Sequence, residues 1–337
     1  MSRHPSLRTL KFAAGILRRR PFSVLVQVTN RCNMACPFCD FWPNGASPKE
    51  ELRLADFEAL AGALAAEGAF LVSIEGGEPL VRPDLVDIVR VFAERGHLPI
   101  LYTNGWFIDA AKARALFAAG LHQVGVSIDF PDARHDEMRR TPGAFDRARA
   151  AATLLRTASA AGAAQVHLMT VVMRENQHLI EPLLELSAGL EVGHHLTLLS
   201  DGGFRRGPAG AHRPDDAAVA GLPALRDRHR HLQSFGSYLE GFPTYLDGGA
   251  ALPRCRAGLQ AFNLDHLGNV APCIEKIDRY VGNVRDTPLP ELLRRLREAD
   301  AGEGCQACWT LCRGMAQALG EGGSLRDWID LGARMRA

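Results

Sequence analysis

The sequence predicts an α/β fold in which helices wrap a parallel sheet. Two observations lead to this prediction. Six short apolar runs with strand character alternate with helical patterns, and polar motifs stand at the carboxyl ends of the first five runs. That edge is where parallel α/β folds gather their ligands and catalytic groups. The sheet is therefore expected to be either a barrel or an open, doubly wound sheet.

The predicted strands are short and bounded by turn residues, and the stretches between them are helical. In chain order the strands are Val24–Val28, Phe70–Glu75, Pro99–Thr103, Gln123–Asp129, Gln165–Val172 and Leu196–Ser200. After the first strand, Ser47-Pro48-Lys49-Glu50 is typical of a capping box with proline at the first helical position. Phe57, Leu60 and Leu64 then supply an apolar stripe, and Gly68 ends this predicted helix.

Length and composition indicate a globular protein. The 337 residues suffice for a full core, and 47% hydrophobic with 23% charged residues are ordinary values. A net charge of +1 argues against nucleic acid as a partner. No run approaches the roughly 18 apolar residues of a membrane span, and no secretory cleavage site follows the first apolar run. The eight cysteines occur in groups, as metal ligands do in a reducing compartment, so we expect a cytoplasmic protein.

Changes in composition divide the chain into five predicted parts. Residues 1–21 form a basic N-terminal helix without acidic residues, suited to peripheral membrane contact, to an acidic partner or to capping a barrel. The strand and helix core spans 22–200. A linker over 201–250, rich in glycine and proline, contains one helix near Pro223–Leu239. A cysteine-bearing module over 251–320 and a C-terminal helix over 321–337 follow.

The most informative stretch of the chain is a CxxxCxxC motif after the first strand, formed by Cys32, Cys36 and Cys39. Three thiols at this spacing can hold three irons of a four-iron cluster and leave the fourth iron without a protein ligand. An open coordination position distinguishes catalytic metal sites from structural ones. The alternatives are a zinc site lacking its fourth ligand, a redox dithiol at Cys36 and Cys39, and chance.

This loop, with Phe38 before its last cysteine, resembles the signature loop of the radical S-adenosylmethionine (radical SAM) enzymes. The resemblance extends over about residues 22–320. It implies a partial, TIM-like (βα)6 barrel whose open side admits substrates. It also implies a 4Fe-4S cluster whose open iron is chelated by SAM, and reductive cleavage of SAM to methionine and a 5'-deoxyadenosyl radical.

The resemblance also suggests which residues bind SAM. Gly76, Gly77, Glu78 and Pro79 stand one strand after the cysteine loop and resemble the motif that binds the SAM amino group. Ser127 and Asp129 alternate on one strand face and are similar to the stretch that contacts the nucleoside, although Asp129 is also suited to capping the turn that follows. Asn104 and Asn176 match family positions less specifically and are equally suited to turns.

The second cysteine group contains Cys255, Cys273, Cys305, Cys308 and Cys312. Five thiols suffice for one closed four-iron cluster with one thiol over, and they satisfy tetrahedral zinc equally well. The spacing resembles the SPASM or shortened twitch module of radical SAM enzymes, a small α+β domain. That resemblance implies one auxiliary 4Fe-4S cluster, because a full SPASM module has seven cysteines for two clusters. Cys255, Cys273, Cys305 and Cys308 reproduce the twitch arrangement, and Cys312 either replaces Cys305 or lies free.

The expected function is that of a radical SAM oxidoreductase or maturase. It cleaves SAM with an electron from a donor such as flavodoxin or ferredoxin, abstracts hydrogen from its substrate and uses the auxiliary cluster for electron transfer or substrate anchoring. The substrate class is a peptide, a small metabolite or a lipid. The alternative from another class is a non-enzymatic iron-sulfur electron carrier or a zinc-binding module.

Overall fold

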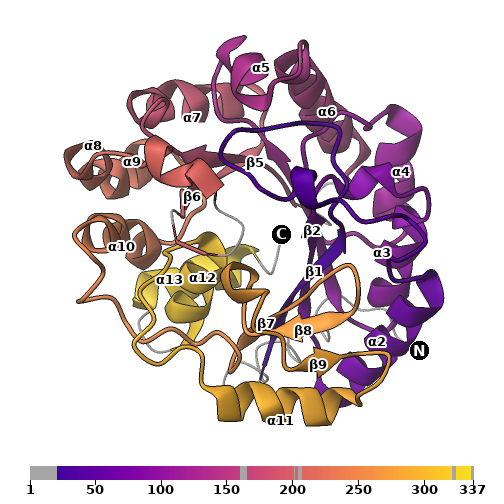
Figure 1. The fold of residues 1–337 in the computed structure, drawn as a ribbon. Coiled ribbons are helices and arrows are strands. Elements are labelled where there is room, and N and C mark those ends of the chain that lie inside the picture. Colours follow the sequence, from indigo (N-terminus) through magenta and orange to yellow (C-terminus); the bar gives the residue numbers. More distant parts are fainter. Residues whose placement is uncertain (1–20, 160–164, 201, 204–206, 321–323, 335–337) are drawn as a thin grey trace.

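The computed structural model describes residues 21–159, 165–200, 202–203, 207–320 and 324–334. The described residues form one sheet in the order β6-β5-β4-β3-β2-β1-β7-β8-β9. Its first six strands pair in parallel and have the bounds β1 (Ser23–Thr29), β2 (Leu71–Gly76), β3 (Leu98–Thr103), β4 (Gln123–Ser127), β5 (Gln165–Val172) and β6 (Gly193–Leu198). The predicted partial barrel is confirmed: β6 and β9 are the two edges, and the sheet curves between them (Figure 1).

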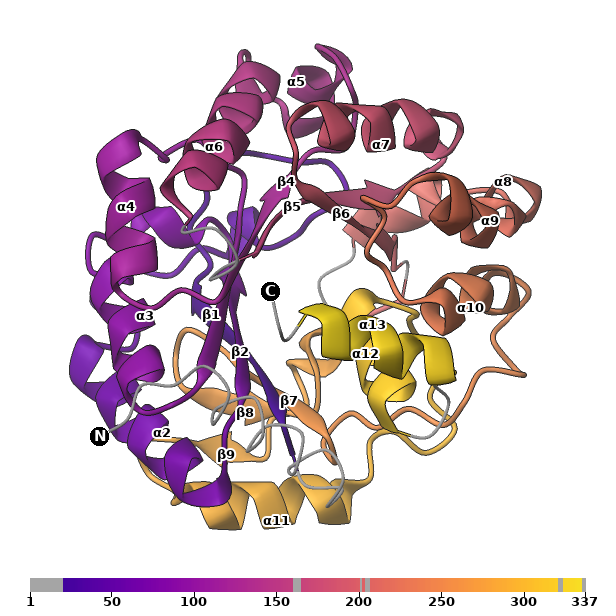
Figure 2. The ribbon, with the colours of Figure 1, turned by 180° about the vertical axis from the view of Figure 1, so that it is seen from behind.

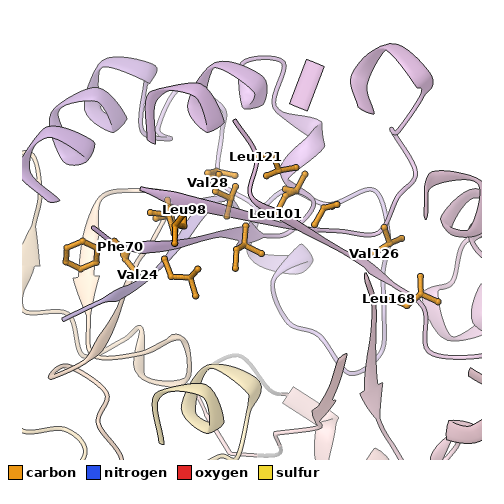
Figure 3. Packing of buried hydrophobic residues seen from close by; sticks show 14 of the residues in the cluster. Val24, Val28, Phe70, Leu98, Leu101, Leu121, Val126 and Leu168 are labelled. Carbon is orange, nitrogen blue, oxygen red and sulfur yellow. The ribbon is translucent and has the colours of Figure 1, made fainter. Parts of the chain in front are cut away.

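Helices cover the outer face of the six parallel strands (Figures 1 and 2). They are α2 (Leu54–Glu67), α3 (Leu85–Glu94), α4 (Ala110–Ala118), α5 (Arg134–Arg139), α6 (Ala144–Ala158) and α7 (Ile180–Gly189). Figure 3 shows strand residues such as Val24, Leu101 and Leu168 packed on this helix side. Because strand side chains alternate, their neighbours Leu25, Tyr102 and His167 face the concave inside of the sheet.

The cysteine-bearing module continues the same sheet. Strand β7 (Ala261–Leu264) pairs in parallel with β1, and β8 (Asn269–Ala271) and β9 (Gly282–Asn283) extend it with antiparallel pairing. Helices α11 (Leu289–Ala299), α12 (Leu311–Gly320) and α13 (Leu325–Arg334) follow, and α12 lies beside α10 (Gly236–Leu246) (Figures 1 and 2). The boundary between a core over 22–200 and a module over 251–320 stays a prediction, as does the whole five-part division.

Several local predictions need correction. The segment 201–250 contains α8 (Asp216–Ala220), α9 (Leu222–Arg228) and α10, where the sequence predicted one helix. The fourth strand ends at Ser127 instead of residue 129, and the sixth runs over 193–198 instead of 196–200. The bond from the Ser47 amide to the Glu50 carboxylate forms, at 3.0 Å, but it closes an isolated turn. Helix α2 begins only at Leu54, where the Arg53 amide donates to Asp56 Oδ2 at 2.8 Å.

Short 3-10 helices connect several elements: η1 (Trp42–Asn44), η2 (Pro79–Val81), η3 (Gln177–Leu179), η4 (Gly207–His212) and η5 (Ile274–Lys276). In the described parts of the chain no helix has the length and apolar character needed to cross a membrane. The predicted N-terminal helix over 1–21 lies almost wholly outside the described residues.

Candidate functional site

The first cysteine group lies in the loop that leaves the carboxyl end of β1. Cys36 is buried, Cys32 and Cys39 are partly buried, and an apolar shell that includes Phe130 and Met173 packs around them. The loop folds tightly, because the Cys39 amide donates to the Cys36 carbonyl at 3.2 Å. The Met34 amide points at Cys32 Sγ over 3.4 Å. Three thiols are thus gathered in one compact, water-poor loop.

Burial and one buried arginine set the electrostatics of this loop. Burial raises the pKa of Cys32 to about 12. Burial also raises the pKa of Cys36, and the nearby Arg139 guanidinium opposes that rise. Thiolates are the metal-binding form, so the thiols must release their protons when metal binds. The donor set of three clustered thiols suits a four-iron cluster with one open iron.

Gly76 and Gly77 hold the second loop against the cysteine loop. The Gly77 amide donates to the Thr29 carbonyl at 2.8 Å, and the Glu78 amide donates to the Arg31 carbonyl at 2.9 Å. A Cβ atom on Gly76, whose φ is 135°, would overlap the carbonyl of Thr29. A Cβ on Gly77 would overlap the carbonyl of Arg31. Close approach of two backbone segments therefore requires these glycines, and the approach positions the residues before Cys32.

Glu78 is a buried junction between three loops. Its carboxylate accepts from the Leu80 amide at 3.0 Å, the Thr103 hydroxyl at 2.8 Å and the Asn104 amide at 2.7 Å. Burial raises its pKa, and these three donors oppose that rise. Asn104 in turn donates from Nδ2 to Asn33 Oδ1 in the cysteine loop at 2.9 Å. Glu78 and Asn104 thus set the geometry of the loops after β2 and β3 relative to the cysteines.

Asp129 has a buried cation as its partner. Its Oδ2 accepts from Arg139 Nε at 2.9 Å and Nη2 at 2.6 Å, and its Oδ1 accepts from the Val171 amide at 3.0 Å. Asn176 donates to the Asp129 carbonyl at 2.9 Å, so it braces the same turn. Asp129 is fully buried, whereas Ser127 is partly exposed. Ser127 therefore has exposed surface that a ligand could reach, and the ribose contact of both residues stays a prediction.

Arg139 is a site residue that the sequence did not indicate. Its Nη1 lies 3.8 Å from Cys36 Sγ, and its guanidinium stands 5.6 Å from the centre of the Phe38 ring. Arg139 is buried at the end of α5, and 103 residues separate it from Cys36. No local pattern distinguishes it from the other arginines of the chain. It places a positive charge beside the cysteine loop.

The five C-terminal cysteines line one pocket together with Leu25 of β1. The Thr310 hydroxyl lies 3.0 Å from Cys312 Sγ and 3.9 Å from Cys308 Sγ. All eight cysteines are free thiols. Among the described residues no three His, Cys, Asp or Glu side chains are arranged to hold a single metal ion. Folding nevertheless brings five thiols from positions 255 to 312 to one place.

The two cysteine groups approach each other across one apolar layer. Leu25, Phe41 and Ile274 form a small buried cluster, and Cys39 and Cys312 both pack against it. The layer contains one residue from β1, one from the cysteine loop and one from η5. The first cysteine site and the pocket of five thiols are therefore neighbours inside one sheet.

Comparisons with known proteins agree with this geometry. The sequence model described as Radical SAM superfamily matches residues 26–187. An AdoMet-dependent heme synthase of Methanosarcina barkeri is 31% identical over 313 residues, which cover 86% of this chain and 88% of that protein. The chain belongs to the radical SAM superfamily. It is accordingly an enzyme, and its activity is SAM-dependent radical chemistry.

Two further comparisons place this radical SAM protein among its relatives. The mycofactocin maturase MftC of Mycobacterium tuberculosis is 29% identical over 314 residues, which cover 88% of this chain and 78% of that one. The crystal structure of Streptococcus suis SuiB bound to S-adenosylmethionine shares the fold, with a TM-score of 0.63 and 16% identity over 85% of this chain and 69% of that one. Membership of this superfamily implies SAM and a 4Fe-4S cluster as cofactors.

Proposed function

We propose that this chain is a radical SAM oxidoreductase whose SAM-binding 4Fe-4S cluster is held by Cys32, Cys36 and Cys39. The observation that carries the proposal is the compact loop in which these thiols stand together, pinned by Gly76 and Gly77 and faced by Arg139. The loop gives three ligands, and the neighbouring polar groups would orient SAM on the remaining iron. Such preorganised positioning accounts for much of the speed of radical SAM chemistry.

For the SAM site we propose a division of labour among the predicted residues. The backbone at Gly76, Gly77, Glu78 and Pro79 and the exposed part of Ser127 would contact SAM directly. The Glu78 carboxylate, Asn104 and Asp129 would act as positioning residues, because their side chains are buried and bonded to protein groups. Arg139 would contribute positive charge beside the cluster and the SAM carboxylate.

We propose further that four of the five C-terminal cysteines bind one auxiliary 4Fe-4S cluster. The support is their convergence on one pocket, within one apolar layer of the first site. A closed cluster there has no open iron for SAM, so electron transfer is the role left to it. The external electron would come from flavodoxin or ferredoxin in a reducing, cytoplasmic compartment, which suits a chain with eight free thiols.

The concave face of the sheet is the proposed substrate surface. Tyr102 and His167 lie with ring centres 6.2 Å apart, and His167 and His195 with ring centres 4.5 Å apart. Glu75 faces Tyr102 across the adjoining strand pair. Carboxylate and imidazole groups can accept the proton that a substrate loses on oxidation. Cys312 also lies near Tyr102, so this polar row adjoins the second cysteine group, which suits an oxidation that passes an electron onward.

A peptide is the substrate class that we favour. The similar proteins include the maturase MftC and the PqqA peptide cyclase of Gluconobacter oxydans, and SuiB has been crystallised with its precursor peptide SuiA. The heme synthases among the relatives favour a second candidate, a small metabolite of the tetrapyrrole class. If the substrate is a lipid reached through the basic residues 1–21, the protein should co-sediment with anionic vesicles. Removing residues 1–20 should then abolish this binding.

Anaerobic reconstitution tests the proposed function. The wild-type protein should hold about eight irons, the content of two four-iron clusters, and should release 5'-deoxyadenosine from SAM with dithionite. Cys36→Ala should retain about four irons and release no 5'-deoxyadenosine. Cys273→Ala, the matched control, should also lose about four irons but keep the change that SAM causes in the electron paramagnetic resonance (EPR) spectrum. Colourless protein with bound zinc, or 5'-deoxyadenosine from Cys36→Ala, would falsify the proposal.

A further inference from the structure

The pocket of five cysteines is lined by more positive than negative side chains. Arg256, Lys276 and Arg313 line it, and Glu275 is its acidic residue. Arg313 is buried and fixed in place, because it donates to the Cys308 carbonyl at 2.7 Å and to the Pro253 carbonyl at 2.9 Å. Lys276 donates from Nζ to the Ala301 carbonyl at 2.6 Å. The formal balance of these four side chains is two positive charges.

Two of the lining residues act on the sulfur atoms themselves. Thr310 Oγ1 lies 3.0 Å from Cys312 Sγ and 3.9 Å from Cys308 Sγ, so one hydroxyl reaches two thiols. Lys276 interacts with a third thiol, that of Cys305. A metal-bound thiolate is only an acceptor, so the hydroxyl and the ammonium must both act as donors to it.

Charge and hydrogen bonds at this distance bear on reduction. One-electron reduction adds a negative charge to a site that its thiolate ligands already make negative. Positive side chains and donors to sulfur stabilise the reduced form, and burial strengthens both effects because little water screens them. The three positive side chains and the two donors to sulfur therefore favour the reduced state of an iron-sulfur group held here, and the charge of Glu275 opposes them.

We propose that Thr310, Lys276 and Arg313 raise the reduction potential of the auxiliary cluster. The proposal rests on the proposed function, since it requires a cluster on the C-terminal cysteines. It adds that side chains which are not ligands tune this cluster, which the cysteine spacing does not contain.

The test measures a potential in the full chain. Replacing Cys32, Cys36 and Cys39 together by alanine leaves the auxiliary cluster as the only cluster, with about four irons. An EPR-monitored titration with dithionite and mediators then gives its midpoint potential. In that background Thr310→Val should lower the equilibrium constant for reduction about tenfold, which is 59 mV for one electron. Lys276→Met should lower it in the same direction.

Matched variants separate tuning from structural damage. Thr310→Ser keeps the hydroxyl, so its potential should stay within about threefold of the parent in equilibrium constant, or roughly 28 mV. Lys112→Met removes a lysine on α4 and should leave the potential unchanged. An unchanged or higher potential in Thr310→Val and Lys276→Met, at about four irons, overturns the inference. A parent without iron or its EPR signal instead overturns the auxiliary cluster itself, and the inference with it.

Discussion

Glu51→Gln probes the junction that holds the entrance to the cysteine loop. Glu51 is buried, and its carboxylate accepts from the Thr29 hydroxyl. It also accepts from Arg31 Nε and Nη2, both at 3.0 Å. Arg82 Nη1 lies 3.5 Å away from the same carboxylate. Arg31 directly precedes Cys32, so the junction fixes the backbone that delivers the first thiol.

The magnitude follows from the burial of the partners. Breaking a buried ion pair costs about 3–5 kcal/mol, since it leaves a charge unpaired. Arg31 is 29% exposed, so water would compensate part of its loss, and Arg82 keeps Asp84 at 2.8 Å. We therefore expect Glu51→Gln to lower the free energy of unfolding by about 2–3 kcal/mol, near the upper range for a hydrogen bond to a charged group.

The assay is anaerobic urea unfolding of the iron-loaded protein, followed by far-ultraviolet circular dichroism. Asp87→Asn is the matched control, because Asp87 and its partner Arg90 are about half exposed, at 50% and 45%. Exposed pairs contribute about 0.2–1 kcal/mol, so the control should lose less than about 1 kcal/mol. A loss in Glu51→Gln no larger than in the control would refute the assigned role of the buried carboxylate.

Three further predictions test the site and its supports. Gly77→Ala should destabilise the protein by at least about 1 kcal/mol and reduce iron loading of the first site, because the new Cβ overlaps backbone, whereas Gly189→Ala meets nothing within 4 Å and should do neither. Arg139→Met should cost about 3–5 kcal/mol in urea unfolding by leaving Asp129 unpaired; a loss under 1 kcal/mol contradicts this. Burial lowers the pKa of His135 to about 4, so only the unfolded chain binds its proton between roughly pH 6.5 and 4. The free energy of unfolding is therefore unaffected by this group above that window, and within it falls by about 1.4 kcal/mol for each pH unit of acidification. His135→Gln should flatten the dependence of the free energy of unfolding on pH between pH 6 and 5, and an identical dependence would exclude the assignment.

Much of the site was predictable because its signals are local. The CxxxCxxC spacing, the two glycines after the second strand and the alternation of strands with helices all lie within short windows. Backbone geometry therefore limits where those residues go, and the parallel sheet brings the ends of its strands to one edge. The family membership and the partial barrel, both read from the sequence, are confirmed.

What depends on contacts between distant residues required the tertiary structure. Arg139 reaches Cys36 across 103 residues, and Arg285 near β9 donates to Asp56 of α2 across 229. The ion pair that buries the Asp129 side chain against Arg139 likewise joins residues whose pairing no local pattern shows. Nothing in the cysteine spacing shows that Leu25, Phe41 and Ile274 form the layer between the two sites. The sequence by itself indicated the fold, the family and the candidate thiols and loops, because those patterns are local. Only the fold decided which charges and donors surround them, because burial and long-range pairing arise when the whole chain packs.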